Sequence, residues 1–164
     1  MKKLTPFLWF DAPLDEVMKY YRAIFKRDFK ALAVRQAGST VTTATFRIRG
    51  QEFMALNGGP HFKFTPAISF FVSCQTQAEV DDLWNKLSQH GEKSRCGWLK
   101  DKYGISWQII PDILGKLLAD RDAAKADRVW QTMLQMGKIE IKKLQVAALP
   151  VAKSRMGRVR MDVY

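Results

Sequence analysis

The segment LDEVMKYYRAI at residues 14–24 has a counterpart 63 residues later, QAEVDDLWNKL at residues 77–87. Both segments carry Glu-Val at their third and fourth positions, and both repeat apolar residues at three- and four-residue spacing. This spacing predicts two helices with one buried face each. Thr76 precedes Glu79 by three residues, which is the spacing of a capping box, and Gly91 stands where a glycine that ends the helix is expected.

Strand patterns surround both helices in the same order. The β-rich segments are residues 7–10, 29–36, 40–49 and 52–56 around the first helix, and 67–73, 93–96, 98–100 and 105–110 around the second. The offset of 63 places Phe7 on Phe70, and an offset of 54 near the ends of the halves places Phe53 on Trp107. Two consistent offsets indicate an internal duplication. The sequence therefore predicts an α+β fold built from two βαβββ modules.

The expected boundaries follow the breaks in this pattern. Residues 1–111 form the paired modules, with the first at 1–59 and the second at 64–111. Residues 112–146 carry helical patterns and form an extension of the same domain, and residues 147–164 form a basic tail. A chain of 164 residues fits one such domain.

Charge and cysteine content limit the possible partners. The net charge is +11, but the basic excess is spread over both ends of the chain, which favours a solvated basic surface over a nucleic-acid site. No apolar run reaches the length of a membrane span, and the N-terminus lacks the apolar core of a signal peptide. Cys74 and Cys96 are predicted to be reduced, and the protein is predicted to be cytoplasmic.

Four motifs resemble one known family. PFLWFD (6–11), ALNGGPHFKF (55–64), CGWLKD (96–101) and GISWQ (104–108) are similar to the PhnB-like branch of the vicinal oxygen chelate superfamily, whose sequences often carry the label demethylubiquinone methyltransferase-like. The superfamily includes glyoxalase I, bleomycin-resistance proteins and extradiol dioxygenases. The resemblance implies a curved mixed sheet around a cleft, the glyoxalase/bleomycin resistance/dioxygenase fold. It also implies a homodimer, with the helical extension bracing the interface.

The resemblance also locates the positions at which metal-dependent relatives hold their metal. By position these fall on Pro6, Met54, Ser69 and Gln108, of which only Gln108 offers a good oxygen donor. Divalent metals require several imidazole or carboxylate ligands, so we expect no metal here. We expect no other cofactor either. The methyltransferase label gains no support, because no glycine-rich turn joins the first strand to its helix.

Seven residues are candidates for a binding cleft. The aromatic candidates can also be core residues, and Asn57 and His61 can be plain turn residues. Gln108 is the strongest polar candidate, because the internal symmetry directs it into the cleft. The predicted ligand-binding set is Trp9, Phe70, Trp98 and Trp107 with the polar anchors Asn57, His61 and Gln108.

The predicted function is therefore the binding of a small apolar or aromatic molecule in the cleft. One alternative is a superfamily enzyme (a lyase, isomerase or dioxygenase), for which His61 is the one histidine in a suitable place to act as a base. The other is a basic accessory protein that binds nucleic acid through its ends.

Overall fold

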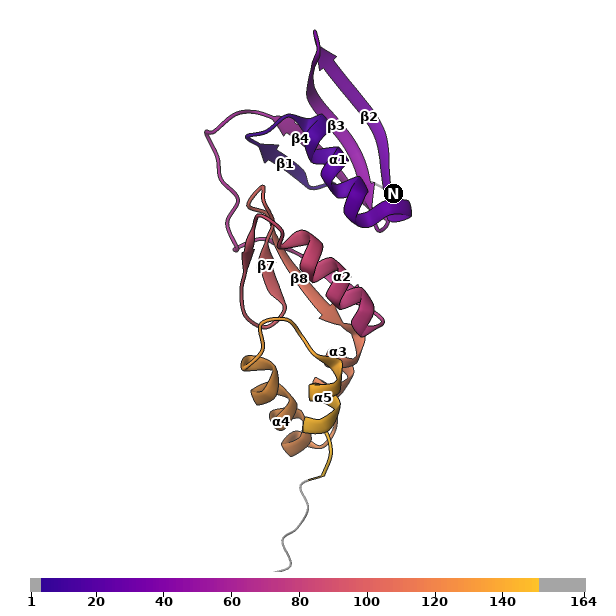
Figure 1. Ribbon diagram of the computed structural model, residues 1–164, viewed down its shortest axis with the longest axis vertical. Coiled ribbons are helices and arrows are strands. Elements are labelled where there is room, and N and C mark those ends of the chain that lie inside the picture. Colours follow the sequence, from indigo (N-terminus) through magenta and orange to yellow (C-terminus); the bar gives the residue numbers. More distant parts are fainter. Residues whose placement is uncertain (1–3, 151–164) are drawn as a thin grey trace, which may run out of the picture.

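The computed structural model describes residues 4–150 of the chain, and it confirms the α+β fold and the C-terminal helices. Two βαβββ modules follow one another along the long axis of the molecule, with the helical extension at the far end (Figure 1). The first module comprises β1 (Phe7–Phe10), α1 (Leu14–Phe25), the 3-10 helix η1 (Lys26–Asp28), β2 (Phe29–Ala37), β3 (Thr40–Ile48) and β4 (Gln51–Asn57). The second comprises β5 (Ser69–Cys74), α2 (Gln77–Leu87), β6 (Glu92–Lys93), β7 (Trp98–Lys100) and β8 (Ser106–Pro111). The extension comprises α3 (Asp112–Leu118), α4 (Ala123–Leu134) and α5 (Ile141–Ala147). Most of the predicted basic tail, residues 151–164, lies outside the described residues.

Each module contains one four-stranded sheet with the same topology. The strand orders are β1-β4-β3-β2 and β5-β8-β7-β6. In both sheets the first strand pairs in parallel with the last, and the remaining pairs are antiparallel. The helix between the first two strands provides the crossover that leads to this parallel pairing. The repeated topology agrees with the duplication that the sequence predicted.

The strand register corrects one detail of that duplication. Phe7 lies opposite Met54 in the first sheet, whereas Phe71 lies opposite Gln108 in the second. Met54 and Gln108 correspond at the expected offset of 54, so Phe7 corresponds to Phe71 and not to Phe70. The first strands are thus related by 64 residues, while the buried faces of α1 and α2 keep the offset of 63. A one-residue shift exchanges the two faces of a strand, so this detail decides which side chains face the core.

A single hydrophobic core joins the two modules. Its members come from α1, α2 and the helix-covered faces of both sheets. Across the junction, the rings of Phe53 and Phe70 meet edge to face with centroids 4.9 Å apart, and the ring centroids of Tyr21 and Trp107 lie 6.0 Å apart. Aromatic pairs at such distances contribute beyond the area they bury. The modules are therefore packed against each other within one chain.

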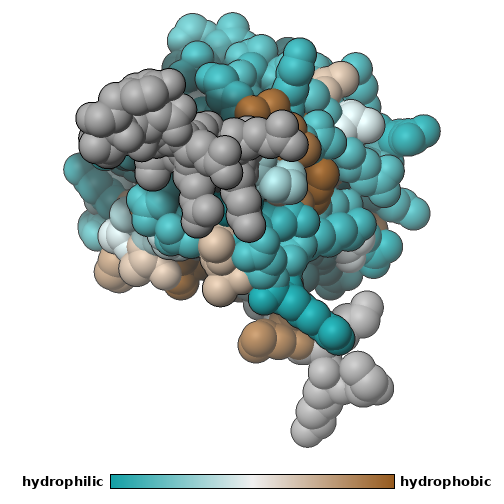
Figure 2. Space-filling view, turned by 90° about the horizontal axis from the view of Figure 1, so that it is seen from below, coloured by the Kyte–Doolittle hydropathy of each residue, from teal (hydrophilic) through white to brown (hydrophobic). Residues whose placement is uncertain are grey.

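The extension has a smaller core of its own against the end of the second sheet. Its buried residues are Ile110, Leu114, Val129, Met133, Met136, Ile139 and Leu144. The backbone amides of Cys96 and Gly97 donate to the carbonyls of Met136 (2.8 Å) and Gly137 (2.7 Å). These bonds attach the extension to the segment before β7. Hydrophilic side chains dominate the end of the molecule that it forms (Figure 2).

The ends of α2 confirm one prediction and correct another. Thr76 caps the helix as predicted, because its side chain accepts a hydrogen bond from the amide of Glu79 at 3.2 Å. The left-handed residue beyond the helix is His90 (φ 61°), not Gly91. Gly91 is required for a different reason, since a Cβ there would lie 2.1 Å from the carbonyl oxygen of Lys100.

Among residues 4–150, no helix is long and apolar enough to cross a membrane.

Candidate functional site

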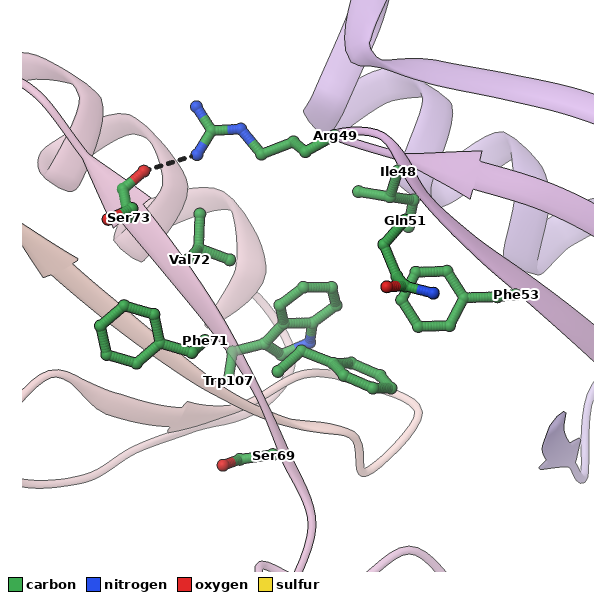
Figure 3. A pocket seen from close by; sticks show the side chains of 10 residues that line it. Ile48, Arg49, Gln51, Phe53, Ser69, Phe71, Val72, Ser73 and Trp107 are labelled. Atoms are coloured by element: carbon green, nitrogen blue, oxygen red, sulfur yellow. Dashed lines mark hydrogen bonds between the residues drawn. The ribbon is translucent and has the colours of Figure 1, made fainter. Parts of the chain in front are cut away.

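A groove of about 520 Å³ lies where the first module meets the edge strand of the second (Figure 3). One side comes from the end of β3, the β3–β4 turn and β4, and the other from β5 and β8. We call it the junction groove, and its lining residues are Ile48, Arg49, Gln51, Phe53, Ser69, Phe70, Phe71, Val72, Ser73 and Trp107.

The walls of the junction groove are mainly apolar, and four of their residues are aromatic. Phe53 comes from the first module, while Phe70, Phe71 and Trp107 come from the second. Phe71 is 60% exposed, so its ring is available to a ligand, whereas Trp107 is only 2% exposed. Small-molecule sites commonly combine such apolar walls with a few polar groups. Here Gln51 and Ser69 supply uncharged polar groups.

Arg49 lies at the rim of the groove, but its charge is already neutralised. The β3–β4 turn places Arg49 and Gly50 in the left-handed region (φ 48° and 85°), which directs the Arg49 side chain toward the second module. Its guanidinium donates to the carbonyl oxygen of Ser73 at 2.8 Å, the bond drawn in Figure 3, and to the carboxylate of Glu79. The carboxylate of Asp28 lies 3.8 Å away. The groove therefore favours an uncharged ligand over an anion.

Of the predicted site residues, the structure brings Phe70 and Trp107 together in the groove walls. Trp98 and Gln108 lie opposite each other in the β7–β8 pair, on the other face of the same sheet. The amide of Gln108 donates to Ser69 Oγ at 2.8 Å, so Gln108 contacts a residue of the groove but does not itself line it.

The other predicted residues lie near the segment that links the modules. Trp9 Nε1 donates to the carbonyl oxygen of Gly59 at 2.9 Å, and the Trp9 ring contacts Phe62. Asn57 ends β4 opposite Phe10. His61 is exposed in the linker. None of these three residues lines the junction groove.

Sequence reasoning missed Phe71, Arg49 and Asp101. Because the offset of 63 paired Phe7 with Phe70, sequence reasoning did not identify Phe71, which is the true counterpart of Phe7. Asp101 follows β7, is 2% exposed, and accepts from Tyr21 Oη at 2.7 Å and Trp107 Nε1 at 2.9 Å. Burial raises the pKa of Asp101 above its ordinary value even though these donors act to lower it. No local sequence motif marks such a contact between distant segments.

The two cysteines are both free thiols. Burial, together with the nearby Glu79 carboxylate, raises the pKa of Cys74 to about 12. The thiolate is the reactive form of cysteine, so Cys74 is not a nucleophile at neutral pH.

The residues at the family's metal positions do not fit a metal. Ser69 and Gln108 are hydrogen-bonded to each other, Met54 is 41% exposed, and Pro6 has no side-chain donor. In the part of the chain that the structure describes, no three His, Cys, Asp or Glu side chains lie close enough to hold a metal ion.

Comparison with known proteins identifies the family. The model of the family described as 3-demethylubiquinone-9 3-methyltransferase matches residues 2–110. The chain belongs to this family. Its membership confirms the PhnB-like resemblance, and its fold is that of the glyoxalase/bleomycin resistance/dioxygenase superfamily.

Solved structures of this fold include relatives of different kinds. The PhnB protein from Bacillus cereus, described as a 3-demethylubiquinone-9 3-methyltransferase, is 35% identical, with a TM-score of 0.59 over 65% of this chain and 97% of that one. Protein PA1353 from Pseudomonas aeruginosa is 17% identical, with a TM-score of 0.53 over 65% and 95%. The fosfomycin resistance protein FosX from Listeria monocytogenes, described in complex with Mn(II) and sulfate, is 14% identical, with a TM-score of 0.49 over 65% and 89%. No curated protein matches the chain.

Proposed function

We propose that this PhnB-like protein binds a small, uncharged apolar or aromatic molecule in the junction groove without a metal. The observation that carries the proposal is the groove itself, a hollow of about 520 Å³ whose lining includes Phe53 of one module and Phe70 and Phe71 of the other. That volume lies within the usual range for small-molecule sites. The neutralised charge of Arg49 supports an uncharged ligand.

The proposal that no metal takes part rests on the donor set. The family positions hold no carboxylate or imidazole, and the one amide oxygen among them belongs to Gln108. Such a set is a poor site for Mn²⁺, Zn²⁺ or Mg²⁺. We therefore transfer neither the Mn(II) of FosX nor the reaction in the family's name to this chain.

Binding of 2-naphthol, measured by isothermal titration calorimetry, tests this function. Phe71→Ala is expected to weaken binding about threefold to tenfold through loss of one aromatic contact. Trp130→Ala is the control, because Trp130 is an exposed aromatic residue (46%) on α4 that lies outside the groove. Treatment with EDTA should leave the affinity unchanged. Equal effects of the two substitutions, or loss of binding in EDTA, would refute the proposal.

We also propose that the protein is a homodimer. Phe7 and Met54 lie side by side on the face of the first sheet that no helix of the chain covers, and they are 55% and 41% exposed. Exposed apolar neighbours of this kind are typical of contact surfaces, and a second copy would cover them in an isologous contact.

Sedimentation velocity of Met54→Glu tests the dimer. This variant should sediment as a monomer, whereas Val146→Glu on α5 should not change the sedimentation of the wild type. The opposite result would place the contact on the extension, where Val146 is 59% exposed.

We further propose a cytoplasmic location, in which the two free thiols persist.

A further inference from the structure

Two adjoining hollows lie between the segment that links the modules and the turn before β8. The apolar one has a volume of about 300 Å³ and the charged one about 370 Å³, and both are lined by Trp9, Phe62, Lys63 and Phe64. Together we call them the linker pocket. It has only Phe70 in common with the junction groove. We propose that the linker pocket binds a small aromatic acid, with its ring beside Trp9 and Phe62 and its acid group among the lysines.

The aromatic side of the linker pocket is firmly built. The rings of Trp9 and Phe62 meet edge to face at 5.0 Å. The indole nitrogen of Trp9 is held by the carbonyl of Gly59, and the backbone at Gly58 lies directly on the ring. A Cβ at Gly58 would come within 2.1 Å of Trp9, so this close approach requires glycine. The indole is therefore fixed before any ligand arrives, which lowers the entropic cost of binding.

The other side of the linker pocket is positively charged. Lys63, Lys100 and Lys102 line it against one carboxylate, that of Asp11. Lys100 pairs with Glu92 at 3.0 Å, but within residues 4–150 neither Lys63 nor Lys102 forms an ion pair. An anion in this pocket would thus meet two ammonium groups without a carboxylate partner.

Lys102 is also held in position. Its ammonium lies 4.8 Å from the ring centroids of both Tyr20 and Tyr103, which is within the range of a cation–π contact. These rings orient the charge without neutralising it. Arg49 of the junction groove differs, because two carboxylates and a carbonyl occupy its guanidinium. The junction groove and the linker pocket therefore select different ligands.

Isothermal titration calorimetry with 2-naphthoate and 2-naphthamide tests the proposal, because the two probes share a shape and differ in charge. Wild-type protein should bind the naphthoate about tenfold more tightly, as expected for charge-assisted contacts that are partly exposed. The double variant Lys63→Gln/Lys102→Gln should bind both probes equally. The double variant Lys116→Gln/Lys142→Gln, with the same loss of charge on the exposed surface of the extension, should retain the preference.

A variant with the opposite effect guards against simple loss of fold. Asp11→Asn removes the one carboxylate of the lining, so it should tighten naphthoate binding about twofold and leave naphthamide unchanged. Equal binding of both probes to the wild type would overturn the anion site. No binding of either probe, or naphthoate binding that Phe62→Ala leaves intact, would overturn the linker pocket altogether. Phe71→Ala should not affect naphthoate binding, so this proposal and that for the junction groove can fail separately.

Discussion

Replacing Asp101 by asparagine tests the polar contact that joins the two modules within their shared core. Asp101 Oδ2 accepts from Tyr21 Oη (2.7 Å) on α1 and from Trp107 Nε1 (2.9 Å) on β8. Oδ1 accepts from the amides of Tyr103 (2.9 Å) and Ile105 (3.1 Å). An asparagine side chain has one acceptor oxygen and one donor amino group, whereas the indole and the amides can only donate. At least one buried donor must then face another donor, which should cost about 1–3 kcal/mol of the free energy of unfolding.

The pH dependence of this loss has a definite sign. Burial raises the pKa of Asp101 in the folded chain above its ordinary value of 3.8. Between these two values the folded chain holds more protons than the unfolded chain, so the stability contributed by Asp101 falls as the pH rises through the folded pKa. This contribution is fully present below the unfolded pKa, and asparagine does not titrate. The wild type should therefore exceed the variant in stability by more near pH 4 than at pH 7.

Urea unfolding followed by tryptophan fluorescence at several pH values between 4 and 7 measures this difference. Asp82→Asn is the control, because Asp82 forms an exposed ion pair with Lys86 (2.6 Å) and its loss should cost less than about 0.5 kcal/mol. If the difference in free energy of unfolding between the wild type and Asp101→Asn grows as the pH rises, the predicted pH dependence is wrong. A gap as small as that of the control would refute the role of Asp101 as the link between modules.

Three further substitutions test the backbone and cap assignments by the same unfolding assay. Gly91→Ala should lower the free energy of unfolding by more than about 2 kcal/mol, because the new methyl group would lie 2.1 Å from the carbonyl oxygen of Lys100 in β7. Gly115→Ala should instead gain about 0.5–1 kcal/mol, because it lies in α3 with no atom within 4 Å of the added Cβ. Thr76→Ala should cost about 1 kcal/mol by removing the cap of α2. Equal effects of the two glycine substitutions would contradict the first two predictions. A Thr76→Ala variant as stable as the wild type would contradict the third.

The order of the elements and the buried faces of both helices could be predicted because local periodicity encodes them. Val80, Leu83, Trp84 and Leu87 recur at helical spacing, and all four are buried. The cap at Thr76 was predictable for the same reason, since its partner lies three residues away. Features of this kind need only the geometry of one helix.

The junction groove and the contact at Asp101 were not predictable in this way. Tyr21 and Asp101 are 80 residues apart, and their hydrogen bond depends on how α1 packs against the second module. Likewise, Arg49 reaches Glu79 because the β3–β4 turn adopts a left-handed conformation, which the sequence at Arg49 does not favour. Gly91 was assigned to the helix end because glycine commonly stands there, although its actual constraint comes from Lys100 across the sheet.

The shift of one residue in the first strands also bears on the question of a metal. With the offset of 64, the residue of the first module that corresponds to Ser69 is Thr5 instead of Pro6. The four symmetry-related side chains then become Thr5, Met54, Ser69 and Gln108, which add a second hydroxyl but still no carboxylate or imidazole. A hydroxyl is a weak ligand for the divalent metals that prefer charged oxygen or imidazole nitrogen. The conclusion that these positions do not fit a metal therefore does not depend on which of the two offsets relates the strands.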